Sequence, residues 1–540
     1  MRQWGSVLCS LLLVACGGRA PSSLSDAAID ARIASGHLHR HLSQSPRTLD
    51  PALNEDVAGY SIEDDLFEGL VRLDAAGAVV PGVASSWTTS ADGRVLLFNL
   101  RREARWSNGD AVQAGDFVYA WRRMLDPATG SVNRAQFAPV ANADAIQAGR
   151  MPLSELGVRA IDAHTLEVRL AAPAPYFMYL LTMCWFMPLH APTLEKYGAT
   201  WTEPGHLVGN GAFVLRSRTA SGPITLARNP LYWDAAAVRL AAVTYHPVTD
   251  TAAATARFLA GDLDITDRFQ LEDLPWLRRD LGGQVRLEPY LATFMMAMNV
   301  TLPPYDDLRV RQALVMSLDR ELLTGTLLKG VYSPARGIVP PLPGYEAVLP
   351  EWAGLSTEAR HAKARALYAA AGYSAARPLE VELWYPISDA DTRKVMEGVA
   401  AMWRATLGAR VSILSEEWRA YQVNRRQHRR GLFYYSRTGD FPDPVTFLAL
   451  AQTAGEQNEM LYASRAYDAA VDEGRRAVAA ADRQRAYHRA EQILNDDAVV
   501  IPIYYYRSKH LVRSHVQGWQ GSAMDRHASR ELWLARTPGR

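Results

Sequence analysis

Strand and helix patterns alternate along the whole chain, and this mixed order is the feature that most limits the possible folds. Residues 95–100 and 165–170 are short apolar or alternating runs that predict strands. Apolar residues at helical spacing predict helices over residues 111–124 (starting near Ala114), 308–328, 358–371 and 392–407, and two more over 462–494 with a break near Ala480. A strand at 499–506 contains Pro502, which predicts an edge or a bend. This order indicates an α/β or mixed α+β fold of several lobes rather than one barrel.

The composition supports large buried cores and carries almost no net charge. Of the 540 residues, 48% are hydrophobic and 21% are charged, which is enough for several domains of about 150 residues. Lys and Arg number 58 and Asp and Glu 57, so the net charge is +1 and no field attracts nucleic acid. Phosphate-binding loops, nucleophile elbows and zinc-protease motifs are absent from the sequence, so the enzyme classes that carry these signatures are not supported.

The first sixteen residues predict an address at the bacterial cell envelope. The apolar run at 7–15 is too short for a membrane span, which needs about 20 residues, and it fits a secretory signal over 1–15. Residues 13–16, Leu-Val-Ala-Cys, resemble the lipobox of lipoprotein precursors, which implies acylation of Cys16. An ordinary cleaved signal or a buried apolar segment are the alternatives. We expect residues 16–35 to hold the lipidated cysteine and a flexible tether, with the protein facing the periplasm.

Only one cysteine, Cys184, lies beyond the N-terminal segment, so we expect no internal disulfide. It belongs to an apolar run of 14 residues, 176–189, that contains Pro188 near its end. The run is shorter than a membrane span and predicts a buried helix end. The lipid anchor is therefore the expected membrane attachment.

A carboxylate after a strand is the strongest binding candidate in the bare sequence. Asp440 follows Gly439 at the end of an aromatic, strand-like stretch, and two prolines bracket Asp443. Such a carboxylate can receive an ammonium group from a ligand. The alternative is a turn or helix-capping role, for which Asp443 is the better placed of the two.

Three alternating histidines, His37, His39 and His41, share one face if they lie on a strand. They then form a line, which matches a tetrahedral metal cage poorly. We predict no metal site and no cofactor. The paired aromatics Trp384 and Tyr385 fit core packing or, less often, the lining of a cleft.

A series of short motifs, in order along the chain, resembles the family 5 extracellular solute-binding proteins, which are the peptide-binding components of ABC importers. The resemblance extends from about residue 36 to 520. Residues 156–162 and 201–205 are similar to the oligopeptide-binding members in particular. The other matching motifs are 49–51, 65–70, 80–87, 98–102, 106–110, 116–121, 229–233, 261–265, 307–314 and 501–505.

The resemblance implies a three-lobed periplasmic-binding fold that closes around its ligand by a hinge near residues 291 and 507. Its expected division is lobe I over 36–67, 191–291 and 508–540, an inserted domain II over 68–190, and lobe III over 292–507.

The resemblance also implies site residues. Asp440 matches the aspartate that pairs with the peptide α-ammonium, and Glu55 matches a glutamate near the ligand. Strands around 292–299 and 434–439 are expected to bind the peptide backbone. Arg437 stands near where the family has an aromatic residue, which favours an acidic ligand group. The remaining expected ligand-binding residues are Phe294, Met295, Met296, Thr438, Gly439, Trp384, Tyr385 and Trp418.

The function implied is capture of short peptides and their delivery to the permease subunits of an ABC importer in the inner membrane, which work with cytoplasmic ATPases. A monomer is expected. Two alternatives stay open. One is the same fold with a dedicated cargo, such as a dipeptide, a murein peptide, a metal chelate or haem. The other is a surface hydrolase or assembly lipoprotein without a transport role.

Overall fold

The computed structural model describes residues 24–387, 390–455 and 457–536. The predicted signal peptide and Cys16 lie outside these residues. Residues 26–35, expected to be part of a tether, instead form helix α1 (Asp26–Ser35). The side chain of Ser25 caps its first turn, and Arg32 binds the carboxylate of Asp264 at 3.0 Å. The folded part of the chain therefore begins about ten residues earlier than expected.

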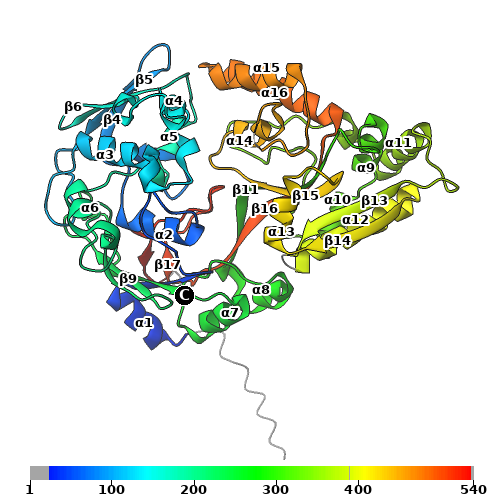
Figure 1. The fold of residues 1–540 in the computed structure, drawn as a ribbon. Helices are drawn as coiled ribbons and strands as arrows, with labels where there is room; N and C mark the ends of the chain where they lie inside the picture. Colours follow the sequence, from blue (N-terminus) through cyan, green and yellow to red (C-terminus); the bar gives the residue numbers. More distant parts are fainter. Residues whose placement is uncertain (1–23, 388–389, 456, 537–540) are drawn as a thin grey trace, which may run out of the picture.

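Three larger sheets organise the molecule into lobes (Figure 1). The first has the order β1-β10-β9-β8, in which β1 and β10 are parallel and the other pairs antiparallel. The second is antiparallel throughout, in the order β4-β5-β7-β6. Their strands are β1 (His37–Leu42), β8 (Phe213–Arg218), β9 (Ile224–Arg228), β10 (Ala242–Pro247), β4 (Ala84–Thr89), β5 (Val95–Leu100), β6 (Val158–Asp162) and β7 (Thr165–Arg169).

The third sheet has the order β12-β16-β11-β15-β13-β14 and contains the two longest strands. β11 and β16 pair antiparallel, but the pairing is interrupted between Pro289 and Thr293. A second shift, between Phe294 and Met295, lies opposite Pro502, so the predicted bend at this proline is confirmed. The strands are β11 (Val285–Met298), β12 (Ser333–Pro334), β13 (Glu380–Pro386), β14 (Arg410–Glu416), β15 (Leu432–Thr438) and β16 (Val500–Leu511). Two-stranded ladders join β2 (Val71–Leu73) with β3 (Val79–Pro81) and β17 (Val516–Gln517) with β18 (Trp533–Leu534).

Most of the predicted elements are confirmed. The strands at 95–100 and 165–170 are β5 and β7, and α3 starts at Ala114, where Gln113 and Asp116 form a reciprocal capping box. The region 462–494 forms two helices that separate before Ala480. Apart from α1, given above, and α9 and α10, given below, the α-helices are α2 (Val57–Leu66), α3 (Ala114–Leu125), α4 (Ala143–Gln147), α5 (Phe177–Leu180), α6 (Ala191–Tyr197), α7 (Thr251–Ala260), α8 (Leu274–Leu281), α11 (Thr357–Ala370), α12 (Ala390–Leu407), α13 (Trp418–Arg425), α14 (Val445–Leu448), α15 (Arg465–Arg476) and α16 (Ala480–Asp497).

The single helix predicted over 308–328 is wrong. Helix α9 (Leu308–Met316) ends before Ser317, and α10 (Arg320–Leu322) starts anew and continues as a short π-helix. The side chain of Asp319 accepts a hydrogen bond from the backbone N–H of Leu322, as an N-cap does. The apolar spacing thus continues through a break that a polar cap creates.

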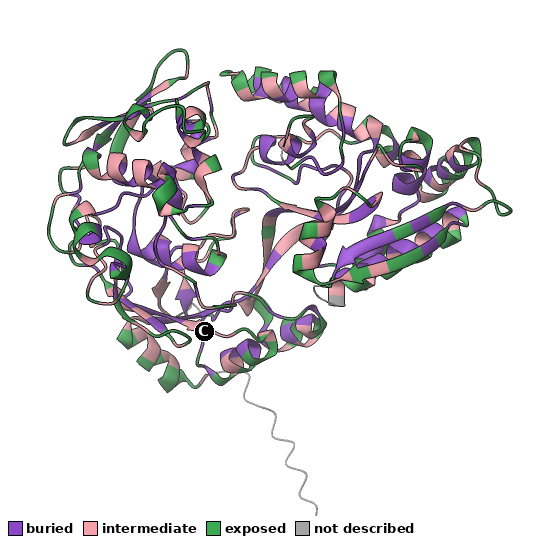
Figure 2. Cartoon of the chain, in the orientation of Figure 1, coloured by how far each residue is buried: buried purple, intermediate pink, exposed green. Residues whose placement is uncertain are grey.

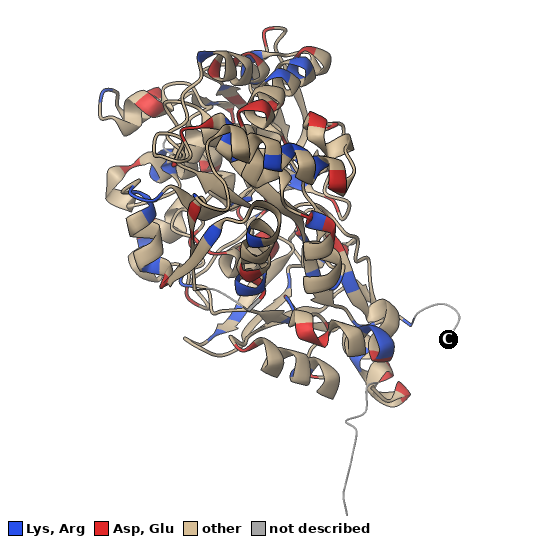
Figure 3. Ribbon diagram, turned by 90° about the vertical axis from the view of Figure 1, so that its right-hand side faces the viewer, with Lys and Arg blue, Asp and Glu red and all other residues tan. Residues whose placement is uncertain are grey.

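Buried residues are found throughout the molecule (Figure 2), and the apolar ones among them form two cores. One runs through the first two sheets and reaches Trp384 on the third; the other fills the space between the third sheet and helices such as α9 and α12. Cys184 is buried in the first core. No helix within the described residues is long and apolar enough to cross a membrane. Basic and acidic residues are interspersed over the surface (Figure 3), in line with the net charge of +1.

The close packing of α15 on α16 yields a test of the fold. A Cβ atom at Gly474 would overlap the buried ring of Tyr487. We expect Gly474→Ala to lower the free energy of unfolding by about 1–3 kcal/mol, although alanine favours a helix. Gly115 in α3 has no atom within 4 Å of such a Cβ, so Gly115→Ala should raise stability by roughly 0.5–1 kcal/mol. Urea denaturation of both variants measures this, and stabilisation by both would contradict the close contact between α15 and α16.

Candidate functional site

A cavity of about 420 Å³ lies where the lobes meet. Its walls come from β1 and α2 in the first lobe, from the segment around Met183 in the second, and from the end of β15 in the third. The hinge-side Tyr290 and the C-terminal segment 519–528 complete it. A cavity with walls from every lobe changes shape when the lobes move, which is what a closing binding site requires.

Asp440 projects its carboxylate from the end of β15 into this cavity, with 35% of its side chain exposed. The turn before it is fixed because Gly439 N–H donates to the carbonyl of Leu291 at 2.7 Å. Thr438 and Gly439 also line the cavity. Asp443, the alternative acid, binds the N–H of Val445 at 3.0 Å and pairs with a buried arginine, which fits its expected capping role.

Arg437 forms an ion pair with the Asp440 carboxylate. Its Nη2 donates to Oδ2 of Asp440 at 2.7 Å, while Nε and Nη2 donate to the carbonyl and hydroxyl of Thr446, each at 2.9 Å. No hydrogen bond to Oδ1 of Asp440 comes from the described residues. One oxygen of the acid is therefore taken by the protein, and the other is open to a ligand.

Tyr60 of α2 lines the same cavity. Burial raises the pKa of its phenol, with smaller contributions from Cys184, Glu63 and Asp440. The phenol is thus neutral at physiological pH and can donate a hydrogen bond. Residues of the first and third lobes thereby line one cavity.

Several residues expected to bind a ligand lie elsewhere. Glu55 is on the surface, 47% exposed, and faces Arg47 at 3.8 Å. Phe294, Met295 and Met296 of β11 are fully buried. Residues 293–297 of β11 pair with β15 on one side and with β16 on the other, so their backbone has no free edge for a peptide. The expectation of a ligand-binding backbone is therefore wrong for residues 293–297, whereas residue 292 lies at the gap in the pairing with β16.

The expected aromatic lining is likewise absent from the cavity. Trp384 and Tyr385 lie on β13 with 2% and 6% exposure, and Trp384 packs against Tyr421 at a ring separation of 4.4 Å. Their role in the structure is core packing. Trp418 at the start of α13 is 46% exposed and does not line the cavity.

β15, by contrast, has an open edge near the cavity. One side pairs with β11 throughout, whereas the other meets β13 only at Phe433. Because Gly439 N–H bonds to Leu291 in the ladder, alternation turns the backbone groups of Ser436 and Thr438 toward the open side. Within the described chain no strand covers this part of the edge, so it can pair with an extended ligand.

The sequence analysis missed the residues of the C-terminal wall. Trp519, Asp525 and His527 lie there beside His510 of β16. His510 Nε2 lies 2.8 Å from Oδ1 of Asp525; burial disfavours charge on this histidine, but the carboxylate outweighs burial and raises its pKa to about 9. No sequence signal singles out these residues, because only the fold brings them together.

The histidines of β1 do share a face, as predicted, but each has its own partner. His37 Nε2 contacts Thr244 Oγ1 at 2.8 Å, and His39 Nδ1 contacts Nε2 of His246 at 3.0 Å. His41 Nε2 lies 2.8 Å from the carbonyl of Val248. Burial lowers the pKa of His39 and of His246 to about 4, so both are neutral at physiological pH.

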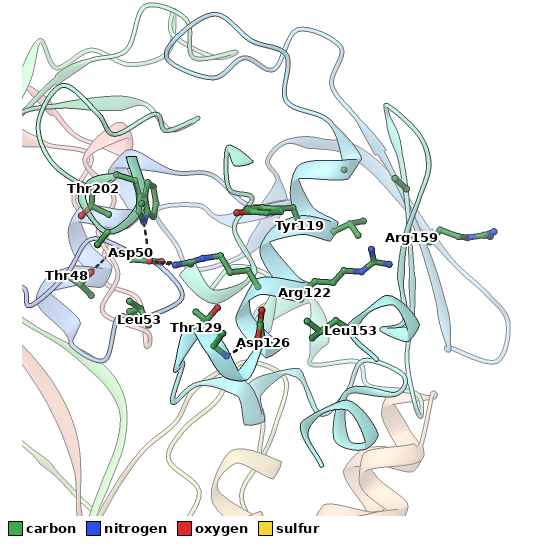
Figure 4. Close-up of a pocket in the computed structure, with 18 residues that line it drawn as sticks. Thr48, Asp50, Leu53, Tyr119, Arg122, Asp126, Thr129, Leu153, Arg159 and Thr202 are labelled. Atoms are coloured by element: carbon green, nitrogen blue, oxygen red, sulfur yellow. Dashed lines mark hydrogen bonds and ion pairs between the residues drawn. The ribbon is translucent and has the colours of Figure 1, made fainter. Parts of the chain in front are cut away.

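A larger hollow, of about 1020 Å³, lies beside α3 (Figure 4). It contains none of the predicted ligand-binding residues and no residue of 292–507. Its central charges satisfy each other: Arg123 binds both oxygens of Asp50, at 2.9 and 2.6 Å, and Arg122 donates to the carbonyl of Ser154 at 3.0 Å. The cavity between the lobes is therefore the better candidate.

Glu63 of α2 is a buried acid next to the cavity-lining residues of that helix, and it belongs to none of the ion pairs described above. It accepts a hydrogen bond from Asn54 at 2.8 Å and is fully buried. Burial raises its pKa to about 8, so it is protonated at neutral pH.

Comparison with known proteins places the chain among binding proteins. A model of the bacterial extracellular solute-binding proteins, family 5 (middle), matches residues 78–459. The chain is 35% identical over 539 residues to the periplasmic oligopeptide-binding protein OppA of Escherichia coli K12, which covers 97% of this chain and 98% of OppA. The unliganded open form of the murein tripeptide-binding protein MppA matches with a TM-score of 0.83 at 36% identity, over 93% of this chain and 97% of MppA. OppA of Haemophilus influenzae in complex with RPPGFSPFR matches with a TM-score of 0.76 at 32% identity, over 93% of this chain and 99% of that OppA chain.

These matches confirm the expected mixed α/β, multi-lobed periplasmic-binding fold.

The buried Glu63 predicts a pH-dependent stability. Its pKa is about 8 in the folded state against an ordinary value of 4.5, so the unfolded chain loses this proton first as pH rises. Stability should fall between these two values, by up to about 1.4 kcal/mol per pH unit. The substitution Glu63→Gln should remove this contribution to the pH dependence of stability. The substitution Glu103→Gln, at an exposed side chain, should leave it unchanged. Thermal unfolding from pH 5 to 7.5 measures the difference, and equal slopes in wild type and Glu63→Gln would refute it.

Proposed function

The chain belongs to family 5 of the bacterial extracellular solute-binding proteins, and we propose that it captures short peptides in the cavity between its lobes for an ABC importer. The observation that carries this proposal is the Asp440 carboxylate at the end of a strand with an open edge. An α-ammonium group and a backbone that can extend are features that unmodified peptides share whatever their side chains. The cavity presents one partner for each.

The open edge of β15 supplies the backbone contacts. Ser436 and Thr438 can each exchange hydrogen bonds with a peptide lying alongside, as a strand added to a sheet does. Such contacts do not depend on the side chains of the peptide. They favour affinity for many sequences, while water in the cavity accommodates different side chains.

Asp440 binds the peptide amine through its open oxygen, Oδ1. The other oxygen stays with Arg437, so the carboxylate is held in place before the peptide arrives. Tyr60 lines the same cavity from the first lobe and is available to the ligand on closure. Arg437 also favours an acidic group near the amine, because its guanidinium is close enough to act on charge there.

Closure takes place where the ladder between β11 and β16 is interrupted, at Pro289 to Thr293 opposite Tyr505 to Arg507. Few backbone hydrogen bonds have to break for the lobes to rotate at such a gap. Peptide contacts from both lobes then stabilise the closed form. We retain the lobe boundaries given above as part of this proposal.

The protein is held at the membrane by acylated Cys16 and faces the periplasm, where it meets the permease subunits as a monomer. It performs no chemistry on its cargo. The absence of chemistry on the cargo is supported by the relatives, since OppA and MppA are named as binding proteins.

A dedicated peptide cargo is the second candidate. It is favoured by the likeness to MppA, named for a murein tripeptide, and by the pairing of Arg437 with Asp440. A subsite with both charges suits a ligand whose amine lies close to a carboxylate. Native mass spectrometry of gently purified protein separates the two candidates. A ladder of peptides of different mass indicates broad capture, whereas one discrete mass indicates a dedicated cargo.

The ammonium contact is tested by Asp440→Asn with two matched ligands, trialanine and N-acetyl-trialanine. We expect the variant to bind trialanine at least a hundredfold more weakly than wild type, because a desolvated ammonium loses its charged partner. Acetylation removes the ammonium, so the acetylated peptide should bind both proteins equally weakly. Isothermal titration calorimetry gives the four affinities.

Glu103→Gln is the control, because it removes one negative charge from an exposed side chain. It should bind trialanine as wild type does. Equal affinity of wild type and Asp440→Asn for trialanine would rule out Asp440 as the amine partner.

A further inference from the structure

We propose that His510, Asp525 and His527 form a binding site for a divalent transition-metal ion on the wall of the cavity. Nε2 of His510 and of His527 lie 2.8 and 3.2 Å from Oδ1 of Asp525, and all three atoms lie within 4.8 Å of one another. Ligand atoms at 2.0–2.2 Å from a tetrahedral zinc ion are roughly 3.3 Å apart. Oδ1 of Asp525 and Nε2 of His527 already have about this spacing, and Oδ1 and Nε2 of His510 must move apart by about 0.5 Å to reach it.

The ring of His510 is already oriented as a metal ligand. Its Nδ1 lies 2.9 Å from the carbonyl oxygen of Thr266. A carbonyl only accepts, so Nδ1 carries a hydrogen and Nε2 is directed at Asp525. Metal-binding histidines commonly donate their other ring N–H to such an oxygen, which fixes the ring. Thr266 is not one of the proposed ligands, so this contact orients His510 independently of Asp525 and His527.

The two other ligands are held by separate contacts. The ring of His527 stacks on Trp519 with centroids 3.6 Å apart and an interplanar angle of 19°. Asp525 has φ of 52°, a left-handed conformation that aspartate adopts more readily than most residues with a side chain. Its Oδ1 contacts both histidines, so the carboxylate lies between them. Pre-positioned ligands reduce the ordering that metal binding requires.

The charges around the cluster are compatible with a cation. Arg526 pairs with Asp64 at 3.3 Å, and the charge of Arg40 is opposed by the buried carboxylate of Asp65. Asp267 lies on the same cavity wall and adds negative charge. On binding, the ion takes the place of the hydrogen between His510 and Asp525, and that proton leaves to solvent.

The ligand set also limits the choice of ion. Two imidazole nitrogens and one carboxylate oxygen suit Zn²⁺, Ni²⁺ or Cu²⁺, whereas Mg²⁺ and Ca²⁺ prefer oxygen ligands. All three residues line the cavity, so the remaining coordination positions face the cargo space. A carboxylate or amine of the cargo then becomes an additional ligand. This last step rests on the proposed function, but binding of the ion itself does not.

Zinc alone is the probe for the test. The protein is purified without a polyhistidine tag, treated with EDTA and titrated with ZnCl₂ by calorimetry in the absence of peptide. We expect one ion per chain with Kd below about 10 µM for wild type and at least a hundredfold weaker binding for His527→Gln. His488→Gln removes a half-buried histidine on α16 that does not line the cavity, and it should bind zinc as wild type does.

Circular dichroism shows whether His527→Gln is folded, and a crystal of the wild type soaked with zinc locates the ion by anomalous scattering. A peak between His510, Asp525 and His527 supports the site whether or not the variant folds. Wild-type Kd above about 1 mM, or a peak elsewhere only, would overturn it. Since no peptide is present, neither result depends on whether peptides are the cargo.

Discussion

The pairing of β11 with β16 positions two parts of the cavity wall that carry the candidate ligand groups. Through β11 the ladder fixes β15, because Gly439 bonds to Leu291, and this places Asp440 at the cavity. Through β16 it fixes His510 in the same cavity. The ladder is interrupted after Pro289, and this gap is where we propose that the walls move apart. A continuous ladder would give equally precise walls but would resist opening, since backbone hydrogen bonds are directional.

The sequence was most informative where the signal is local. Gly439 and Asp440 end an aromatic strand and precede two prolines, and the structure does place this acid in the cavity. The misreading of β11 had a local cause as well. A run such as residues 293–297, buried on both faces, is typical of the centre of a sheet, and here both of its edges are already paired. The apolar spacing over 308–328 predicts one helix, but Asp319 within this run is a good N-cap residue, and it starts a new helix there.

Other features have no local signal at all. His510 and Asp525 are fifteen residues apart and meet because the chain turns back through β17 and passes the end of β16. Glu63 looks like an ordinary polar residue of a helix, and only the packing of the chain around it removes it from water and keeps it protonated. Motif analysis finds residues that are close in sequence, whereas desolvation and ligand geometry arise from tertiary contacts. This is why the cavity walls required the structure and the fold class did not.

In the proposed function, the pairing of Arg437 with Asp440 determines how an amine is selected. Together the two side chains carry no net charge, so from a distance they attract an ammonium group little more than the neutral surface does. Selection then depends on short-range contact with Oδ1, which falls off steeply with distance and angle. A surface lysine or a free metal ion gains little from such a subsite, whereas an amine carried on an extended backbone also gains the edge of β15. The ion pair thus makes recognition depend on the shape of the ligand around its charge, rather than on the charge alone.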